Sequence, residues 1–436
     1  MVRPAPVPPL PAPLDIVLIT GLSGESGEIG RDIASGFTDT VNDLRLAETL
    51  RLVVRDDGGN TATLATLARQ AAQHPHTIAM IGPDRADGFD AMAEQAKAGR
   101  LAAFAPMGAP PEDADPSQRS WSFSLQAPNV SQGQMLARVL QRVLPGGHVT
   151  RLIAEDARPD GLWQGLAEAY RGTRSELREI VWHKAADPAA QIAAIADLTA
   201  TDAMVVSLPG PQAADAVRTL RQAGYDGQIV TTGDGSLASF PDRFKGDRRE
   251  AVQQGFYTTG QLSLVPFTPR MAGAESQRLV QAYRAAHQAE PSWAYATGHD
   301  LAVIVANFLA HGAKAGSLSA VDIARLRDSL RTHLLTLRQR AAPEAGLTGA
   351  LTFDENGQRD QPMKLVVTHD LLQTPFMMQF SDRPQLATQG RADPQGVTLG
   401  DLSYPLIPAV SPPPAPSPSL PSARRWHGWI GRLWPP

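Results

Sequence analysis

Short β-rich runs alternate with amphipathic helical stretches from Leu14 onward, and this alternation limits what the chain can fold into. The first strands are predicted at residues 16–19, 50–54, 77–81 and 101–105, with helices between them at 29–41, 61–74 and 90–98. Apolar residues at helical spacing, such as Ile29, Ile33 and Phe37, indicate the first of these helices. Strand and helix in regular succession predict a parallel sheet that is covered by helices on both faces.

The same rhythm restarts after a connecting strand predicted at residues 121–125. Strands are predicted at 151–154, 179–183, 203–207 and 228–232, with helices at 131–143, 162–170, 189–197 and 213–223. Another crossover strand is predicted at 254–259, and helices follow at 274–287, 295–311 and 319–332. This second series predicts a second doubly wound α/β lobe.

In the C-terminal part of the chain, regular structure is predicted at first and then fades. Residues 347–353 and 363–368 are predicted to form a terminal β-hairpin, because Asn356-Gly357 between them is a favoured pair at a hairpin turn. The alternation fades after Asp370, which leaves an irregular extension at 376–409. Residues 410–421 are rich in proline and serine, as is typical of an extended linker without a core.

The last segment, residues 422–436, is rich in tryptophan and arginine. A short helix there would carry an apolar stripe formed by Trp426, Trp429, Ile430 and Leu433. Such a stripe beside arginines favours contact with a protein partner or a membrane surface. Gly428 and Gly431 weaken a helix, so a disordered tail remains the alternative interpretation.

The composition argues against several classes of protein. The net charge of −4 and the lack of a basic run in the globular part argue against nucleic acid as a partner. The chain has no cysteine, which excludes disulfides, thiol catalysis and thiolate metal sites. Six prolines within residues 1–13 forbid the apolar helix of a secretory signal. No stretch approaches the roughly 18–20 apolar residues of a membrane span.

Motifs that would indicate catalysis are also missing from the sequence. The glycine-rich stretch 21–30 follows a strand, but it has neither the dinucleotide-binding pattern nor the Gly-Lys pair of a phosphate-binding loop. Asp56 and Asp57 precede two glycines at a strand end, where acidic residues usually cap a turn or a helix. We therefore expect no catalytic residue, no metal and no cofactor, and we predict that the protein is not an enzyme.

Six segments together carry a resemblance to a known family. They are GLSGESGEIGRDIASGF (21–37), VVRDDGGNTATLATLARQ (53–70), TIAMIGP (77–83), AFAPMGA (103–109), LRQAGYDGQIVTTGDG (220–235) and LTGALTFDENGQ (347–358). In this order and spacing, they resemble the type I periplasmic binding proteins, and specifically the branched-chain-amino-acid group of ABC-transporter receptors. The resemblance extends from Leu14 to about Asp370.

The resemblance implies two lobes joined by three crossovers, which are placed near residues 123–126, 254–257 and 348–351. Lobe 1 would comprise residues 14–123 and 257–347, and lobe 2 residues 124–256 and 348–375. Members of this family bind a ligand between the lobes and close over it. The Pro-rich segment 1–13 lies outside both lobes.

Ligands of open parallel sheets bind beyond the carboxyl ends of the strands, which selects the loops 21–29, 82–89, 106–109, 207–212 and 233–236. The resemblance implies that Ala86 and Ala109 occupy positions where amino-acid-binding members have a serine and a threonine. Asp234 aligns with an acid that binds the ammonium group of the ligand, and His299 aligns with a tyrosine. The complete set of predicted ligand-binding residues is Ser23, Arg85, Ala86, Met107, Gly108, Ala109, Asp234 and His299.

The function implied by the resemblance is capture of a small molecule, such as an amino acid or an amide, for uptake through a membrane permease. The missing hydroxyl groups weaken the expectation of an amino-acid ligand. Two alternatives remain open: a ligand sensor or regulator with the same fold, and a protein that has lost the ligand and docks a partner. The family implies a periplasmic location, whereas the lack of a visible signal segment leaves a cytoplasmic one open.

Overall fold

The chain divides into two compact α/β units in this computed structural model. The structure describes residues 13–23, 27–85, 88–106, 118–127, 129–155, 161–195, 198, 201–232, 237, 240, 261–271, 274–314, 322–339, 346–359, 363–369, 372–379, 391–393, 396–399 and 402–405. The described residues of unit 1 fall within Met1–Gly133, Arg158–Gly165 and Pro266–Met363, and those of unit 2 within Gln134–Ala157, Leu166–Val265 and Lys364–Pro436.

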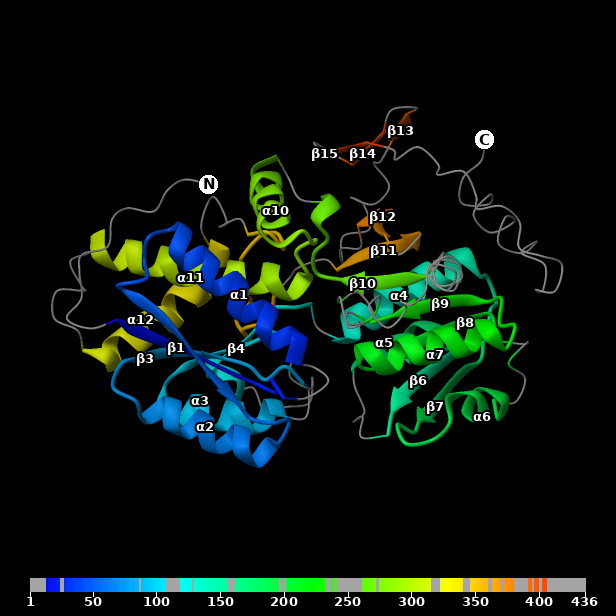
Figure 1. Cartoon of the computed structure of the whole chain (residues 1–436), viewed down its shortest axis with the longest axis horizontal. Helices are drawn as coiled ribbons and strands as arrows, with labels where there is room; N and C mark the ends of the chain where they lie inside the picture. The colour runs from blue at the N-terminus through cyan, green and yellow to red at the C-terminus, as the bar shows by residue number, and fades with distance from the viewer. Residues whose placement is uncertain are drawn as a thin grey trace. The chain divides into compact units, whose positions relative to one another are not determined.

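Unit 1 is built around a parallel sheet with the strand order β2-β1-β3-β4-β5 (Figure 1). Its strands are β1 (Leu14–Thr20), β2 (Leu50–Asp56), β3 (Thr77–Ile81), β4 (Ala102–Ala105) and β5 (Ser122–Ser124). All residues of β1, β3, β4 and β5 are buried, whereas β2 at the edge is largely half-buried or exposed. The sheet is therefore covered on both faces, as the apolar strand sequences predict.

Helices pack on both sides of this sheet (Figure 1). They are α1 (Gly27–Asp43), α2 (Thr61–Gln73), α3 (Phe89–Gly99), α10 (Ala274–His287), α11 (Trp293–Lys314) and α12 (Ile323–Thr336), with short 3-10 helices η2 (Gln118–Trp121), η5 (Pro269–Met271) and η6 (Leu337–Gln339). Helices α2 and α3 lie on one side, where Leu64 and Met92 join Val17 and Met80 in a buried cluster. Helices α1, α11 and α12 lie on the other side.

Helices α1 and α11 pack so closely that their backbones meet at two glycines. A Cβ atom at Gly36 would collide with the backbone oxygen of Tyr295, and one at Gly298 would collide with the backbone oxygen of Ile33. The Tyr295 hydroxyl donates to Asp39 Oδ2 at 3.2 Å, which adds a polar contact between the two helices. The two helices therefore form one tightly packed pair.

Unit 2 contains a seven-stranded sheet with the order β12-β11-β10-β9-β8-β6-β7. Its strands are β6 (Val149–Ala154), β7 (Leu177–Trp182), β8 (Ala203–Ser207), β9 (Gln228–Thr231), β10 (Leu262–Val265), β11 (Lys364–His369) and β12 (Leu372–Gln379). Strands β6 to β10 are parallel to one another, and β11 and β12 are antiparallel to their neighbours. The helices are α4 (Asn129–Val143), α5 (Gly161–Tyr170), α6 (Pro188–Ala193) and α7 (Gly210–Gln222). Residues of α6 and α7 form a buried cluster with Leu152, Met204 and Ile229 of the sheet.

The predicted terminal hairpin is wrong. Strand β11 pairs with β10 and β12, and residues 351–354 form no strand. The physical reason is that side chains hydrogen bond the backbone of 347–350: Leu347 N donates to Asp300 Oδ1 (2.6 Å), and Arg359 Nη2 donates to Ala350 O (2.9 Å). Strand β10 was not predicted; the strand expected at 254–259 lies outside the described residues.

The chain changes unit at 133/134, 265/266 and 363/364, later in sequence than the crossovers placed near 123–126, 254–257 and 348–351. It also changes unit at 157/158 and 165/166, because residues 158–165 belong to unit 1. Three short strands, β13 (Arg391–Asp393), β14 (Gly396–Leu399) and β15 (Leu402–Pro405), form a separate antiparallel sheet within 376–409, where the sequence predicts no regular structure. Residues 1–12 and the tail 422–436 lie outside the described residues.

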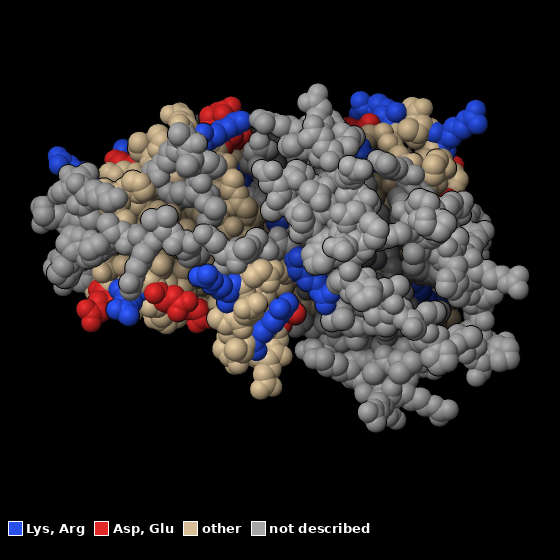
Figure 2. Space-filling view, turned by 90° about the horizontal axis from the view of Figure 1, so that it is seen from above, with Lys and Arg blue, Asp and Glu red and all other residues tan. Residues whose placement is uncertain are grey.

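Surface charge on the described residues is mixed. On the face seen in Figure 2, Lys and Arg side chains lie among Asp and Glu side chains, in keeping with the small net charge of −4. Among the helices that the structure describes, none has the length and apolar character needed to cross a membrane.

The contact between α1 and α11 gives the first prediction. The substitution Gly36→Ala places a methyl group against the backbone of Tyr295, which cannot move without displacing α11. We expect the free energy of unfolding to fall by about 1–3 kcal/mol, measured by urea denaturation. The control is Ser35→Ala on the exposed side of α1, which should change stability little. Equal stability of the two variants would contradict this packing.

Candidate functional site

The candidate site lies at the carboxyl end of the unit 1 sheet. Because β1, β2 and β3 are parallel neighbours, the loops that follow them meet at the same end of the sheet. There the structure brings together Thr20 and Gly21 after β1, Asp57 after β2, and Asp84 and Arg85 after β3. These five residues are called the sheet-end cluster below.

Asp84 holds the loops after β1 and β3 together. Its Oδ2 atom accepts hydrogen bonds from the Thr20 hydroxyl (2.7 Å) and from the Gly21 backbone N–H (3.0 Å). Asp84 is buried, with 4% of its surface exposed. A buried carboxylate is tolerated only when such donors and a nearby cation satisfy it.

Arg85 supplies that cation and connects two carboxylates. Its Nη1 atom lies 2.8 Å from Asp57 Oδ2 and 3.4 Å from Asp84 Oδ1. The side chains of Asp57 and Asp84 are 0% and 2% exposed, whereas that of Arg85 is 19% exposed. The exposed part of Arg85 is not its Nε or Nη2 atom, because both of these atoms are buried, and its Nη1 atom faces the two acids.

Backbone geometry after β2 explains why Asp57 points into this cluster. Gly58 and Gly59 adopt φ angles of +60° and +73°, which glycine takes without strain. The resulting turn lets Gly59 N donate to Asp57 Oδ1 at 2.9 Å. The Gly-Gly pair thus orients a buried carboxylate, in addition to ending the strand.

The pKa of Asp84 is raised above its ordinary value by burial, with a further contribution from the negative charge of Asp57. The hydrogen bonds from Thr20 and Gly21 and the charge of Arg85 act in the opposite direction, but they do not outweigh burial. The charge of the sheet-end cluster therefore depends on pH through Asp84.

Ser23 lies beside the adjacent carboxylate, Asp56. A hydrogen bond from the Gly58 backbone (2.8 Å) lowers the pKa of Asp56, and a hydrogen bond from the Ser23 side chain lowers it further. Asp56 is exposed. The predicted residue Ser23 is thus part of the contact between the loops after β1 and β2, next to the sheet-end cluster.

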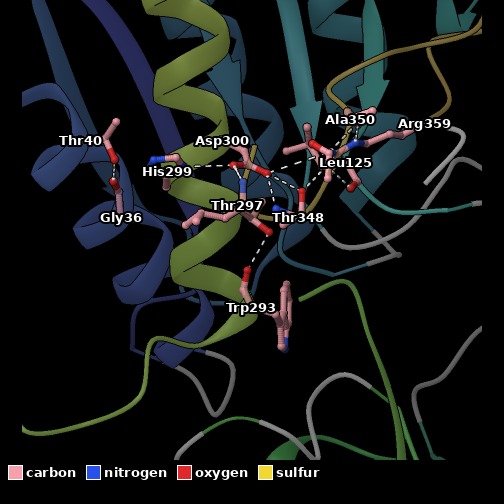
Figure 3. A network of polar contacts seen from close by, with 12 residues as sticks. Gly36, Thr40, Leu125, Trp293, Thr297, His299, Asp300, Thr348, Ala350 and Arg359 are labelled. Carbon is pink, nitrogen blue, oxygen red and sulfur yellow. Dashed lines mark hydrogen bonds and ion pairs between the residues drawn. The ribbon is translucent and has the colours of Figure 1, made fainter. Parts of the chain in front are cut away.

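His299 has a different environment, in α11. It is completely buried, and its Nδ1 atom lies 3.1 Å from Asp300 Oδ1 (Figure 3). Asp300 also accepts hydrogen bonds from Leu347 N (2.6 Å), from Thr348 N (3.0 Å) and from the Thr348 hydroxyl. The structure thus connects His299 to the segment after α12, within unit 1, and does not place it among the sheet-end residues.

Arg359 completes this second group, called the Asp300 network below (Figure 3). Its guanidinium donates to Leu125 O (3.3 Å), to the Thr348 hydroxyl (2.7 Å) and to Ala350 O (2.9 Å), and it lies 4.0 Å from Asp300 Oδ2. Burial lowers the pKa of Arg359 to about 10, although the charge of Asp300 opposes the shift. Arg359 is therefore still a cation at neutral pH.

Asp300 remains ionised in this setting. Burial raises its pKa, but hydrogen bonding to His299, the charges of His299 and Arg359, and the hydrogen bond from Thr348 together outweigh burial. The pKa of Asp300 therefore lies below its ordinary value. The Asp300 network is a satisfied structural ion pair that fixes the path of residues 347–350.

The remaining predicted site residues cannot be placed. Ala86, Met107, Gly108, Ala109 and Asp234 lie outside the residues that the structure describes. Sequence reasoning did not select Thr20, Asp57 or Asp84, although each lies at or just after the carboxyl end of a strand. The signal that was available is an acidic residue in the loops after β2 and β3, the two strands that flank β1.

Within the described part of the chain, no group of three His, Cys, Asp or Glu residues is placed to hold a metal ion. The arrangement of the sheet-end cluster is suited to binding, since it offers a cation held in place by two buried acids.

Comparison with known proteins places this geometry in a family. Residues 13–370 match the family described as periplasmic binding protein. The chain belongs to the periplasmic binding protein family. No curated protein sequence matches it.

Solved structures of this family share the fold at low sequence identity. A leucine-binding protein LivK from Thermotoga maritima has a TM-score of 0.68 and 18% identity, over 83% of this chain and 97% of that one. The branched-chain amino acid transporter substrate-binding protein LivJ from Streptococcus pneumoniae, in complex with isoleucine, has a TM-score of 0.65 and 18% identity, over 83% and 97%. An ABC-transporter solute-binding protein from R. palustris, in complex with benzoate, has a TM-score of 0.67 and 15% identity, over 84% and 96%. The two-unit type I periplasmic binding fold predicted from sequence is confirmed.

The raised pKa of Asp84 predicts a pH-dependent contribution to stability. A carboxyl group whose pKa is raised on folding stabilises the folded state at low pH, and this contribution is lost as the pH rises through the folded-state pKa. The variant Asp84→Asn cannot lose that proton, so its stability relative to the natural protein should increase as the pH rises. Urea denaturation of both proteins over a series of pH values measures the difference.

Asp56→Asn is the matched control, because the pKa of Asp56 is lowered. Its natural carboxylate stabilises the folded state above the unfolded-state pKa and loses this contribution as the pH falls, so the trend should have the opposite sign. A stability difference for Asp84→Asn that is constant with pH would contradict the raised pKa.

Because Asp300 and Arg359 are buried together, we expect the effects of replacing each of them on the free energy of unfolding not to add. Asp300→Asn or Arg359→Met alone leaves a buried charge without its counterion, and each should cost about 3–5 kcal/mol of unfolding free energy. The double variant removes both charges, so it should cost clearly less than the sum of the single variants. Denaturation of the four proteins of this cycle measures the coupling, and additive costs would show that the pair is not coupled.

Proposed function

We propose that this protein is a solute-binding protein that captures a small carboxylate-bearing molecule for an ABC-type uptake system. Family membership supports the proposal. Two structural neighbours were solved with isoleucine and with benzoate, and both of these molecules carry a carboxylate group. A membrane permease would be the partner, and the periplasm would be the location.

The observation that carries the proposal is the position of Arg85. Two buried acids contact its Nη1 atom, and its Nε and Nη2 atoms are buried at the end of the sheet, so the guanidinium is a cation held in an enclosed place beside the loops after β1 and β3. A charge-assisted hydrogen bond between guanidinium and carboxylate is short and strong, and arginine is well suited to it. We therefore propose that Arg85 binds the carboxylate group of the solute.

This assignment also accounts for the alanines at positions 86 and 109. The resemblance puts hydroxyl groups there in amino-acid-binding members, where they hold the ligand carboxylate. A chain that has Ala86 and Ala109 needs another donor for that carboxylate, and Arg85 is adjacent to the first position. Asp234 keeps its proposed role toward an ammonium group, which an amino acid has and an aromatic acid lacks.

The proposal gives no direct ligand contact to His299. Its ring is fully enclosed in unit 1 and faces Asp300, so its proposed contribution is to position α11. Ser23, Met107 and Gly108 remain proposed contacts through their loops after β1 and β4.

Ligand capture is tested by thermal-shift screening followed by calorimetry with isoleucine, leucine, benzoate and the corresponding amides. A carboxylate ligand should raise the melting temperature, because a ligand at a hundredfold over its dissociation constant stabilises the folded state by about 2.7 kcal/mol. The amide analogue of the same ligand should bind more weakly. Arg85→Gln should reduce the affinity for the carboxylate by roughly 10–100-fold, as expected for loss of a hydrogen bond to a charged group.

The matched control is Arg174→Gln, which removes an exposed arginine of unit 2. It should leave the affinity unchanged. Equal affinity of the natural protein and Arg85→Gln for the carboxylate would refute the role of Arg85. Absence of any ligand in the screen would refute solute capture and favour a protein that docks a partner.

A further inference from the structure

A hollow of about 550 Å³ lies in unit 1 between strand β2 and helix α2, along the side of the sheet. Its floor is largely apolar and includes Val17, Val53, Leu67 and Ala71. Its volume is within the range of about 300–1,000 Å³ that is typical of ligand pockets. It lies along the edge strand, so it is a different feature from the sheet-end cluster.

The topology explains why the hollow exists. Strand β2 is the edge of the sheet, and α2 connects it to β3, two positions away, so the helix crosses over β1. The inner face of β2 is therefore only partly covered, and Val53 is half-buried where the interior strands are fully buried. One more strand beside β2 would close this gap.

The backbone of β2 can accept such a strand. Its ladder with β1 ends with Asp57 N donating to Thr20 O at 3.1 Å. In a parallel ladder every second residue bonds to the same neighbour, so Leu52 and Val54 direct their N–H and C=O groups away from β1. Val54 O is contacted by Arg55 Nη1 at 3.2 Å, and β1 is the only described strand that pairs with β2.

The charged side chains along β2 indicate which kind of segment could bind beside it. Arg51 and Arg55 are exposed and lie on the same face of the strand as Val53, because side chains alternate along a strand. Four residues of strand separate the two arginines by about 13 Å. Arg51 donates to the buried carboxylate of Asp15 from Nε (2.8 Å) and from Nη2 (3.1 Å), so the net positive charge on the exposed rim of the hollow comes mainly from Arg55.

A buried hydroxyl group lies beside the hollow. Thr77 is among the residues around the hollow, and its Oγ1 atom is buried without a hydrogen-bond partner. Buried polar groups in folded proteins are nearly always paired. Thr77 lies at the same end as Asp15, Arg51 and His74, so polar capacity is left unused at that end.

We propose that β2 is a docking site for an extended acidic segment of a partner protein, which adds to the sheet as a sixth strand of unit 1. The segment has the pattern acidic-x-apolar-x-acidic. Its two acidic residues pair with Arg51 and Arg55, and its apolar residue covers Val53 and closes the hollow. Backbone hydrogen bonds to Leu52 and Val54 give the affinity, and the two arginines give the selectivity.

A second copy of this chain is a poor occupant. Two β2 strands that pair antiparallel about Val53 would put Arg51 of one copy opposite Arg55 of the other. Like charges directly opposite each other destabilise a strand pair. The charge pattern therefore selects an acidic partner over self-association.

The test uses the fluorescein-labelled peptide acetyl-Thr-Glu-Thr-Val-Thr-Glu-Thr-amide and the full-length protein, with fluorescence anisotropy as the measurement. We expect this peptide to bind, and the same peptide with both Glu replaced by Lys not to bind. N-methylation of the peptide amides that face β2 should abolish binding, because strand addition needs those donors. Arg55→Glu should weaken binding of the Glu peptide by at least about tenfold.

Arg69→Glu is the matched control, because it makes the same charge change on an exposed position of α2 that does not line the hollow. It should leave the affinity for the Glu peptide unchanged. Lack of binding of the Glu peptide to the natural protein, or equal affinity in Arg55→Glu, would overturn the proposal. A dimer in size-exclusion chromatography that Arg55→Glu strengthens, because the substitution turns the Arg51–Arg55 repulsion into an attraction, would assign β2 to a second copy instead.

Discussion

All strands of the unit 1 sheet run in the same direction, and this constraint decides where the unit can interact with anything else. Parallel neighbours must be joined by crossovers, and the helices of those crossovers cover both faces of the sheet. Among the described residues, two places that these helices leave uncovered are the carboxyl end, where loops from neighbouring strands meet, and the edge strand β2. The sheet-end cluster occupies the first place and the hollow lies along the second.

The two groups of buried charged residues in unit 1, the Asp300 network and the sheet-end cluster, have different environments. In the Asp300 network, the hydrogen-bond partners of Asp300 and Arg359 are protein groups inside unit 1. These two side chains bond the backbone of residues 347–350, which a neighbouring strand would otherwise do. In the sheet-end cluster, two buried acids hold an arginine that keeps contact with the surface. The first arrangement fixes the path of the chain, and the second holds a largely enclosed guanidinium at the end of the sheet.

The sequence predicted local structure better than long-range pairing. Strands β3 and β8 and helix α10 were predicted with the observed boundaries, because each is a self-contained run bounded by clear turn residues. The terminal hairpin was wrong because the Asn-Gly turn is a local signal, whereas Asp300 and Arg359 act on residues 347–350 from other parts of the chain. Ser23 and Arg85 were selected by their loops, but the pairing of Asp84 with Thr20 spans 64 residues and leaves no local pattern.

The contact of α1 with α11 through Gly36 and Gly298 has a mechanical consequence. No side chain lies between the two backbones at these points, so there is no soft layer that could absorb a displacement. Helix α1 starts just after the β1 loop, and α11 carries His299 and Asp300. The tight contact therefore makes α1 and α11 one rigid support, which joins the start of α1 to the helix that carries the Asp300 network.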